Sequence, residues 1–222
     1  MPSQPPRSPE DQALLERLGA LYPAVVSDHL DRLGYRHQVM APDIRPLFPE
    51  AQVVGVAFPV LAVPVYHMPD KPYKIEMEAV DSLSPGDVMI VSRIDISFWG
   101  ELLSTAARYR GCEGVVIDGY TRDTQAIIQM RFPCFVRGIH VADSLGRLEV
   151  LAYQVPVECG GVRVEPGDLI LGDYDGVVVI PRTVAEKVIA GAEEKVRGEN
   201  LVRKHLQEGM PVSEAFRRFG VI

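Results

Sequence analysis

Cysteine and clustered basic residues are both scarce in this sequence, and each shortage excludes a class of protein. Only three of the 222 residues are cysteine, and no two of them form a CxxC pair. Free thiols in a reduced, cytoplasmic protein are therefore expected rather than a disulfide framework. The net charge is −7 and no cluster of lysine and arginine occurs. This argues against a nucleic-acid partner, because phosphate contacts need clustered positive charge.

Long apolar runs and the common nucleotide and nucleophile motifs are also missing. Proline or glycine interrupts the longest apolar stretches well short of a membrane span, and the N-terminus lacks the apolar segment of a signal peptide. No P-loop, GxGxxG or GxSxG motif occurs, and the histidines have no partner at zinc-ligand spacing. These absences predict no membrane partner and no zinc site.

The length and composition predict one domain with appendages. At 222 residues and 47% hydrophobic composition, the chain can bury roughly 70% of its unfolded surface without disulfides. We expect a disordered tail over residues 1–9, a single α/β domain over residues 10–182, and a C-terminal helical extension over residues 183–222.

Apolar periodicity predicts alternating strands and helices through the middle of the chain. Three short apolar runs indicate buried parallel strands joined by helices in βαβ units. Val53–Val65 is broken by prolines and predicts one or two strands near a sheet edge. The other predicted elements are helices over 10–21, 27–34 (Ser27 as N-cap), 73–83, 99–111, 125–130, 183–208 and 212–219, strands over 88–91, 114–117, 134–136, 169–171 and 177–180, and a hairpin within 149–164.

A polar loop follows the central predicted strand and carries the first candidate site. The turn residues Asp118-Gly119 end that strand, and Asp123 or Thr124 can cap the next helix. Open α/β sheets bind ligands beyond the carboxyl ends of their strands. There Arg122 can clamp a carboxylate and Asp123 can bind a hard metal ion. For a single Arg-Asp pair, a surface arginine beside a helix-capping aspartate is the commoner arrangement.

The segment Trp99–Leu103 is the second candidate, at the start of another predicted helix. A helix N-terminus offers free backbone N–H groups, here around Leu102 and Leu103, to an anion. Glu101 is alternatively only a first-turn acid favoured by the helix dipole. Because this segment and Arg122-Asp123 follow neighbouring strands, we expect both loops to open into one crevice.

Two weaker candidates lie towards the C-terminus. Gly172–Gly176 carries two aspartates, for which a tight turn is the simpler interpretation and a metal site the alternative. The predicted tail helix carries Glu193, Glu194 and Glu199, and a solvated helix face is the favoured interpretation of these charges.

Six collinear segments carry a further signal: Ser27–Asp31, Pro85–Val88, Trp99–Leu103, Gly114–Asp123, Phe135–Gly138, and Pro166 through Val177. Together they resemble the RraA-like or class II pyruvate-aldolase family, and the resemblance covers most of residues 12–222. That family includes 4-hydroxy-4-methyl-2-oxoglutarate/4-carboxy-4-hydroxy-2-oxoadipate aldolases and regulators of ribonuclease activity. The resemblance implies a swivelling β/β/α-type domain, assembled as a homotrimer or homohexamer.

The resemblance also implies roles for residues of the two loops. Asp123 would coordinate a divalent metal, Mg²⁺ or another cation such as Mn²⁺, largely through water. Arg122 would bind the carboxylate or keto oxygen of the substrate. Gly100 and the backbone amides of Leu102 and Leu103 would hold the pyruvyl carboxylate.

Two glutamates would complete that site. Glu101 would touch the waters of the metal, and a glutamate from the tail helix of the next subunit would join through water. Glu199 is the first choice for this residue and Glu194 the second. The chain departs from the aldolases at Ser92–Ile96, where a glycine-rich run is usual, and at His140, so the roles of Asp95 and His140 and the identity of the substrate stay open.

The predicted function is a divalent-metal-dependent lyase that cleaves a 2-oxo acid through a pyruvate enolate, by aldol cleavage or by oxaloacetate decarboxylation. One alternative is a non-catalytic regulator that binds an RNA-degrading enzyme. The regulators of this family are shorter and lack the helical region from Thr183 onwards, which favours the enzyme. Another alternative is a sugar-acid dehydratase that uses the same metal.

Overall fold

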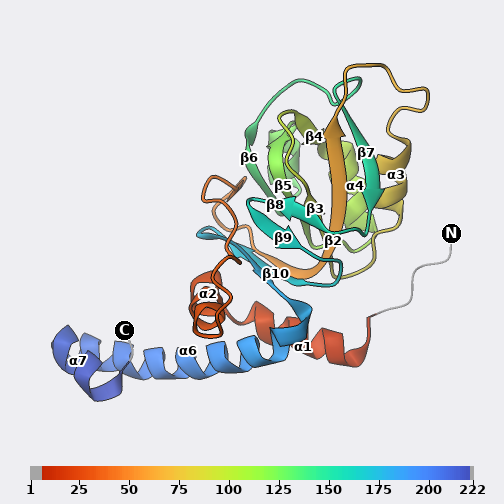
Figure 1. The fold of residues 1–222 in the computed structure, drawn as a ribbon. Coiled ribbons are helices and arrows are strands. Elements are labelled where there is room, and N and C mark those ends of the chain that lie inside the picture. The colour runs from red at the N-terminus through yellow and green to blue at the C-terminus, as the bar shows by residue number, and fades with distance from the viewer. Residues whose placement is uncertain (1–6, 221–222) are drawn as a thin grey trace.

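The structure is a computed structural model that describes residues 7–220, and its centre is a nine-stranded mixed sheet (Figure 1). The strand order is β1-β6-β5-β3-β2-β10-β11, with β4 paired to β5 and β7 paired to β2. The strands are β1 Arg45–Pro46, β2 Val53–Pro64, β3 Asp87–Val91, β4 Ser97–Trp99, β5 Gly114–Thr121, β6 Cys134–Ile139, β7 Leu148–Tyr153, β10 Leu169–Asp173 and β11 Gly176–Ile180.

The middle of the sheet is parallel, as the βαβ pattern predicts. β2 pairs with β3, β3 with β5, and β5 with β6, all in parallel. The connecting helices are α3 Lys74–Asp81, α4 Glu101–Tyr109 and α5 Thr124–Gln129. Parallel neighbours need such crossovers because the end of one strand and the start of the next lie at opposite edges of the sheet.

Three layers result from the way the two sheet faces are covered. On one face, α3, α4 and α5 bury residues such as Ala79, Ala107 and Ile127 against the sheet. On the other face lies a separate hairpin of β8 (Val157–Cys159) and β9 (Val162–Val164), whose valines pack on the sheet. The fold is therefore the predicted α/β, swivelling β/β/α type.

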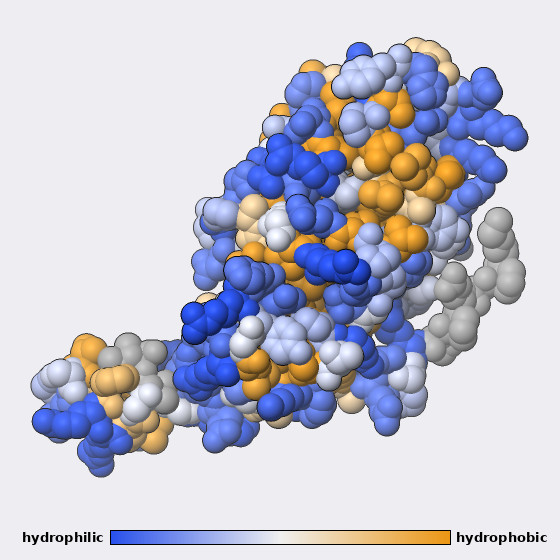
Figure 2. Space-filling view, in the orientation of Figure 1, coloured by the Kyte–Doolittle hydropathy of each residue, from blue (hydrophilic) through white to orange (hydrophobic). Residues whose placement is uncertain are grey.

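The terminal helices form a separate apolar cluster with the β10–β11 end of the sheet. α1 (Pro9–Gly19), α2 (Pro23–Arg32) and the start of α6 (Ala185–Gln207) pack on β10 and β11, with the short turn η1 (Arg182–Val184) before α6. The rest of α6 projects from the body and carries α7 (Val212–Phe219) at its end (Figure 1). Apolar atoms show at the surface of that end (Figure 2). Over residues 7–220, no helix combines the length and apolarity that crossing a membrane requires.

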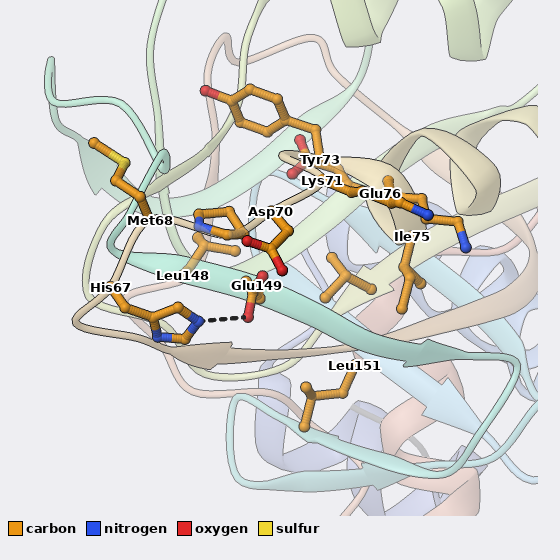
Figure 3. Close-up of a pocket in the computed structure, with 13 residues that line it drawn as sticks. His67, Met68, Asp70, Lys71, Tyr73, Ile75, Glu76, Leu148, Glu149 and Leu151 are labelled. Atoms are coloured by element: carbon orange, nitrogen blue, oxygen red, sulfur yellow. Dashed lines mark ion pairs between the residues drawn. The ribbon is translucent and has the colours of Figure 1, made fainter.

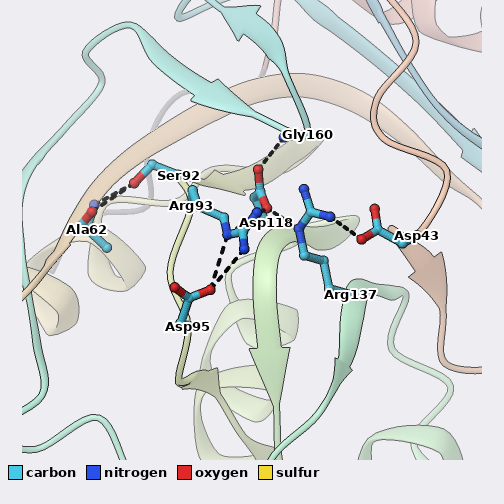
Figure 4. A network of polar contacts seen from close by, with 8 residues as sticks. All are labelled: Asp43, Ala62, Ser92, Arg93, Asp95, Asp118, Arg137 and Gly160. Atoms are coloured by element: carbon cyan, nitrogen blue, oxygen red, sulfur yellow. Dashed lines mark hydrogen bonds and ion pairs between the residues drawn. The ribbon is translucent and has the colours of Figure 1, made fainter.

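Strand β5 is longer than its apolar run predicts, because the expected turn at Asp118-Gly119 is wrong. Asp118 is only 3% exposed and stays inside the strand. It accepts hydrogen bonds from the Arg137 side chain and, at 2.7 Å, from the backbone N–H of Gly160 in the β8–β9 connection (Figure 4). Arg137 also pairs with Asp43. A charge satisfied in this way can remain in a buried strand.

Strand β2 is central, which corrects its predicted place near a sheet edge. β3 lies along one side of β2, while β10 pairs with residues 53–56 and β7 with residues 60–64 along the other side. Pro59 falls in the gap between these two partners. A proline is tolerated there because no sheet neighbour needs its missing N–H.

Helix starts and the N-terminal tail also differ from the sequence prediction. The second helix begins at Pro23, so Ser27 lies inside it and is not the N-cap; proline suits a first helical turn. Of the predicted disordered tail, residues 1–6 lie outside the described residues. The Arg7 side chain donates to the Pro85 carbonyl, and Ser8 caps α1 by accepting from the backbone N–H of Asp11.

The three cysteines are unpaired, as expected, and all three are buried. Burial raises the pKa of the Cys112 and Cys134 thiols to about 12. Such thiols are packing residues, because the reactive thiolate form is suppressed.

Candidate functional site

The two predicted loops leave the sheet side by side because β4 pairs with the end of β5. Trp99 is the register partner of Thr121. The Trp99 carbonyl accepts from the backbone N–H of Arg122 at 3.0 Å and from the hydroxyl of Thr121 at 2.9 Å. The sequence predicts that this helix starts at Trp99. Because Trp99 belongs to β4, helix α4 begins two residues later, at Glu101. The expected common location of the two loops is found.

Asp123 joins the loops through its side chain rather than capping its own helix. One carboxylate oxygen, Oδ2, accepts from the backbone N–H of Glu101 at 3.2 Å, while no side-chain capping bond reaches α5. Asp123 has φ 56°, a left-handed conformation that aspartate tolerates better than most residues. A Cβ on Gly100 would lie 2.6 Å from Oδ2, so only glycine leaves room for this contact.

The N-terminus of α4 presents free donors beside Asp123. The first main-chain bond of this helix runs from Ser104 N–H to the Gly100 carbonyl. The N–H groups of Leu102 and Leu103 precede it and therefore have no acceptor in the helix. The carboxylate of Glu101 accepts from the Thr105 hydroxyl at 2.8 Å. Glu101 thus meets Asp123 through its backbone and not through its carboxylate.

Arg122 lies between two carboxylates. Its Nε is 4.0 Å from Asp123 Oδ2, and a terminal nitrogen is 3.2 Å from Asp143 Oδ1. Tyr73 donates its hydroxyl to Asp143 Oδ2 at 2.6 Å. Burial opposes ionisation of Asp143, but the hydrogen bond from Tyr73 and the charge of Arg122 hold the pKa of Asp143 below its usual value. Asp143 is thus a fixed anion that orients Arg122.

A cavity of about 500 Å³ lies beside the N-terminus of helix α3, and Tyr73 is one of the residues that line it (Figure 3). Residues 67–71 and 73–76 line one side of it and β7 residues Leu148–Leu151 the other. Glu76 lines this cavity although only 7% of the residue is exposed. Burial, reinforced by the charge of Asp143 and opposed by that of Arg122, raises the pKa of Glu76 to about 7.

The donor set around Asp123 fits only a cation that keeps most of its water. Among residues 7–220, no three histidine, cysteine, aspartate or glutamate side chains are grouped to enclose a metal ion. Asp123 supplies one carboxylate, with its side chain 49% exposed. Mg²⁺ is held in this way in many sites, through one or two carboxylates and several waters. The residues present are compatible with such an ion.

The tail glutamates lie on α6, and two of the three already have partners in this chain. Glu199 accepts from the Tyr22 hydroxyl and lies 3.5 Å from Lys195 Nζ. Glu193 pairs with Arg17 of α1. Glu194 is exposed and makes no hydrogen bond or ion pair with any described residue. Of the two glutamates considered for a neighbouring site, Glu194 is therefore the one free to reach it.

The weaker candidates have local structural roles. Asp173 accepts from the backbone N–H of Asp175 at 2.8 Å and so shapes the β10–β11 turn. Asp95 is 78% exposed on its side chain and pairs with Arg93 at 3.0 Å. His140 extends the β5–β6 pairing by donating its backbone N–H to the Thr121 carbonyl, and its Nδ1 accepts from Ala142 N–H.

Sequence reasoning missed Tyr73, Glu76 and Asp143. Tyr73 and Asp143 are 70 positions apart and belong to no motif. Their only local signal is weak, since single polar residues beside loops are common. The contact with Arg122 arises from the order of strands and from the loop after β6.

Comparison with known proteins supports a single family. A family model described as RraA-like, Aldolase/RraA, matches residues 23–179. A Halalkalibacterium halodurans protein named "Putative 4-hydroxy-4-methyl-2-oxoglutarate aldolase" is 31% identical over 194 residues, which cover 86% of this chain and 87% of that protein.

Solved structures agree with this match. An uncharacterized protein from Pseudomonas syringae superposes with a TM-score of 0.81 at 30% identity, covering 96% of this chain and 99% of its own. Streptomyces coelicolor RraAS2, described as an unusual member of the RNase ES inhibitor RraA protein family, gives a TM-score of 0.79 at 27% identity, covering 88% of this chain and 98% of its own. The chain belongs to the RraA-like family.

Proposed function

We propose that this protein is a divalent-metal-dependent lyase that cleaves a 2-oxo acid through a pyruvate enolate. The observation that carries the proposal is the convergence of three groups within two adjoining loops. These are the half-exposed carboxylate of Asp123, the free N–H groups at the start of α4, and the guanidinium of Arg122. The aldolase name of the Halalkalibacterium halodurans relative supports the same reaction class.

Each group has a distinct part in this reaction. The N–H groups of Leu102 and Leu103 bind the substrate carboxylate, as helix N-termini bind anions. Arg122 stays beside the C2 keto oxygen and stabilises the negative charge that develops there. Asp123 holds the cation, Mg²⁺ or Mn²⁺, with Glu101 near its waters. The bound cation supplies Lewis-acid stabilisation of the enolate.

Aldol cleavage and decarboxylation are both compatible with these groups, because each breaks a C3–C4 bond and leaves the same enolate. The substrate class is therefore a 4-hydroxy-2-oxo acid or oxaloacetate. A sugar-acid dehydratase would use the same cation but would release no pyruvate.

The test is a screen for pyruvate release from a panel of 4-hydroxy-2-oxo acids and oxaloacetate. We expect release with at least one substrate in the presence of Mg²⁺, loss of release after chelation with EDTA, and recovery when Mg²⁺ or Mn²⁺ is restored. Pyruvate release that persists after exhaustive chelation would refute metal dependence. A 2-oxo product formed from a sugar acid, without pyruvate, would favour the dehydratase.

A ribonuclease regulator is the second candidate, favoured by the likeness to Streptomyces coelicolor RraAS2. Chain length does not separate the two candidates, since RraAS2, described as an unusual family member, matches 88% of this chain, whereas the Thermus RNA-processing inhibitor RraA matches 70% of it. This candidate predicts that the purified protein slows RNA cleavage by a ribonuclease and releases no pyruvate from the panel above.

The proposal includes a homotrimer or homohexamer whose active sites are shared between subunits. It is supported by the projecting end of α6 and by the exposure of Leu201, Val212 and Phe216 there. Exposed apolar side chains gathered on a projecting segment favour burial against another subunit. The tail glutamate that completes the site is Glu199 or Glu194. Glu194 is favoured because it has no hydrogen-bond or ion-pair partner among the described residues of its own chain.

Mixing inactive variants tests this arrangement. Asp123→Ala and Glu194→Ala proteins, combined under conditions that exchange subunits, should regain part of the activity because some interfaces then hold both intact residues. The same mixture with Glu199→Ala identifies which glutamate acts. No recovery with either glutamate variant, despite exchange shown by differently tagged subunits, would mean that the site lies within one chain.

A further inference from the structure

Glu76 has the surroundings of a proton-transfer group rather than of a structural carboxylate. It lies on α3 and lines the cavity of about 500 Å³ (Figure 3). Within the described part of the chain its carboxylate makes no hydrogen bond and no ion pair. Buried carboxylates that only support a fold are normally paired, as Asp118 is. A buried carboxyl that is unpaired and open to a cavity is free to exchange a proton with a bound molecule.

A series of side-chain contacts links the proposed pyruvyl site to the cavity. Asp123 and Arg122 lie within 4.0 Å of each other, Arg122 binds Asp143, and Asp143 binds Tyr73, which lines the cavity. To reach the cavity, a 2-oxo acid anchored at Leu102 and Leu103 has to extend beyond C3, past Arg122, along this series of contacts.

Charged groups around the cavity complete the description. Asp143 and Arg122 act on Glu76 with opposite sign, and Asp143 has the larger effect. The other titratable residues that line the cavity are His67, Asp70, Lys71, Tyr73, Lys74 and Glu149. His67 and Glu149 are 3.8 Å apart and form their own pair, so Glu76 is the unpaired acid of the buried wall.

We propose that Glu76 is the general base of aldol cleavage and takes the proton from the C4 hydroxyl of a 4-hydroxy-2-oxo acid whose distal half lies in this cavity. The inference rests on the proposed function and assigns its substrate class. As the proton passes to the Glu76 carboxylate, the O–H bonding pair becomes the π bond of a C4 carbonyl, the π pair of the C2 carbonyl moves onto its oxygen, and the C3–C4 bond breaks. The electron pair of the broken C3–C4 bond forms the C2–C3 double bond of the enolate. Water then protonates C3 to give pyruvate, and Glu76 releases its proton to solvent.

The pKa of Glu76, near 7, suits this role. A general base works best when its pKa is close to the operating pH. The ionised form is the base, so aldol cleavage should slow as pH falls below about 7 while Glu76 becomes protonated.

Decarboxylation of oxaloacetate separates this role from a structural one. Loss of carbon dioxide from C4 yields the same enolate with no hydroxyl proton to remove, so it needs the pyruvyl anchors but not the base. The Glu76→Gln variant should therefore lower kcat/KM for aldol cleavage by about 100- to 10,000-fold and leave oxaloacetate decarboxylation within about threefold of wild type. Glu76→Asp, which keeps a carboxylate with a shorter reach, should retain more aldol activity than Glu76→Gln.

The matched control is Glu78→Gln on the exposed side of the same helix, where Glu78 lies 3.8 Å from Lys74. It should change neither reaction. Equal loss of both reactions in Glu76→Gln, with an unchanged melting temperature, would overturn the proposal and make Glu76 a positioning residue for Arg122. Unchanged aldol cleavage in Glu76→Gln would overturn it and leave the lyase function standing. A wild-type protein that releases pyruvate from no substrate would overturn the proposed function and the base together.

Discussion

Replacing Asp123 with alanine should lower pyruvate release about 1,000-fold and leave thermal unfolding nearly unchanged. On the proposed function Asp123 would hold the cation, and removing its carboxylate would then cost several kcal/mol of transition-state stabilisation. A loss of about 4 kcal/mol corresponds to about three powers of ten in rate. The fold should tolerate the change because the Asp123 side chain is half exposed and accepts a single weak hydrogen bond from Glu101. Steady-state kinetics across a Mg²⁺ titration, with a melting curve for each variant, measures both effects.

Two further variants separate charge from loop geometry. Asp123→Asn keeps an acceptor for the Glu101 N–H but loses the negative charge, so it should be nearly as inactive as alanine. Asp173→Ala removes a turn-forming aspartate from the β10–β11 connection and should leave turnover unchanged. Near-normal activity of Asp123→Asn at limiting Mg²⁺ would show that Asp123 only fastens α4 to its neighbour and does not hold the cation.

Replacing Asp118 with alanine should destabilise the protein by about 3–5 kcal/mol, the usual effect of removing one partner from a buried ion pair. Asp118 is almost fully buried, and its loss leaves the Gly160 N–H without its acceptor and Arg137 with Asp43 alone. For a chain of this size, a change of that magnitude lowers the melting temperature by about 10 °C. Urea unfolding gives the free energy, and calorimetry gives the melting temperature.

Asp95→Ala is the matched control, because Asp95 belongs to the same polar network but lies at its exposed end (Figure 4). Exposed ion pairs contribute at most about 1 kcal/mol, so this variant should melt within about 4 °C of wild type. If Asp118→Ala and Asp95→Ala melted at the same temperature, the network around Asp118 would be replaceable by water, and the link between β5 and the β8–β9 hairpin would rest on apolar packing.

Local sequence patterns were enough to predict the helices with one apolar face and the strands that are apolar throughout. The strand at Val88–Val91 and the last helix at Val212–Phe219 occur where the sequence predicts them. The convergence of Arg122 with the start of α4 was also predictable, because neighbouring parallel strands end at one edge of a sheet. Each inference needed only periodicity, turn chemistry and strand order.

Long-range contacts determine the features that are predicted wrongly from the sequence. Asp118-Gly119 has the composition of a turn, yet the strand continues because Arg137 and the Gly160 N–H satisfy the carboxylate. Pro59 indicates a sheet edge, yet β2 is central because the proline falls between two successive partners. No local propensity contains this information, since the partners come from distant parts of the chain.

By itself, the sequence determined the α/β class, the family resemblance and the two loops that carry Arg122 and Asp123. Only the tertiary structure decided that Tyr73 and Asp143 bind each other and orient Arg122, and that Glu76 lies buried and unpaired beside a cavity. The physical reason is that a motif records neighbours along the chain. The protonation and orientation of a side chain depend instead on burial and on charges that folding brings close to it.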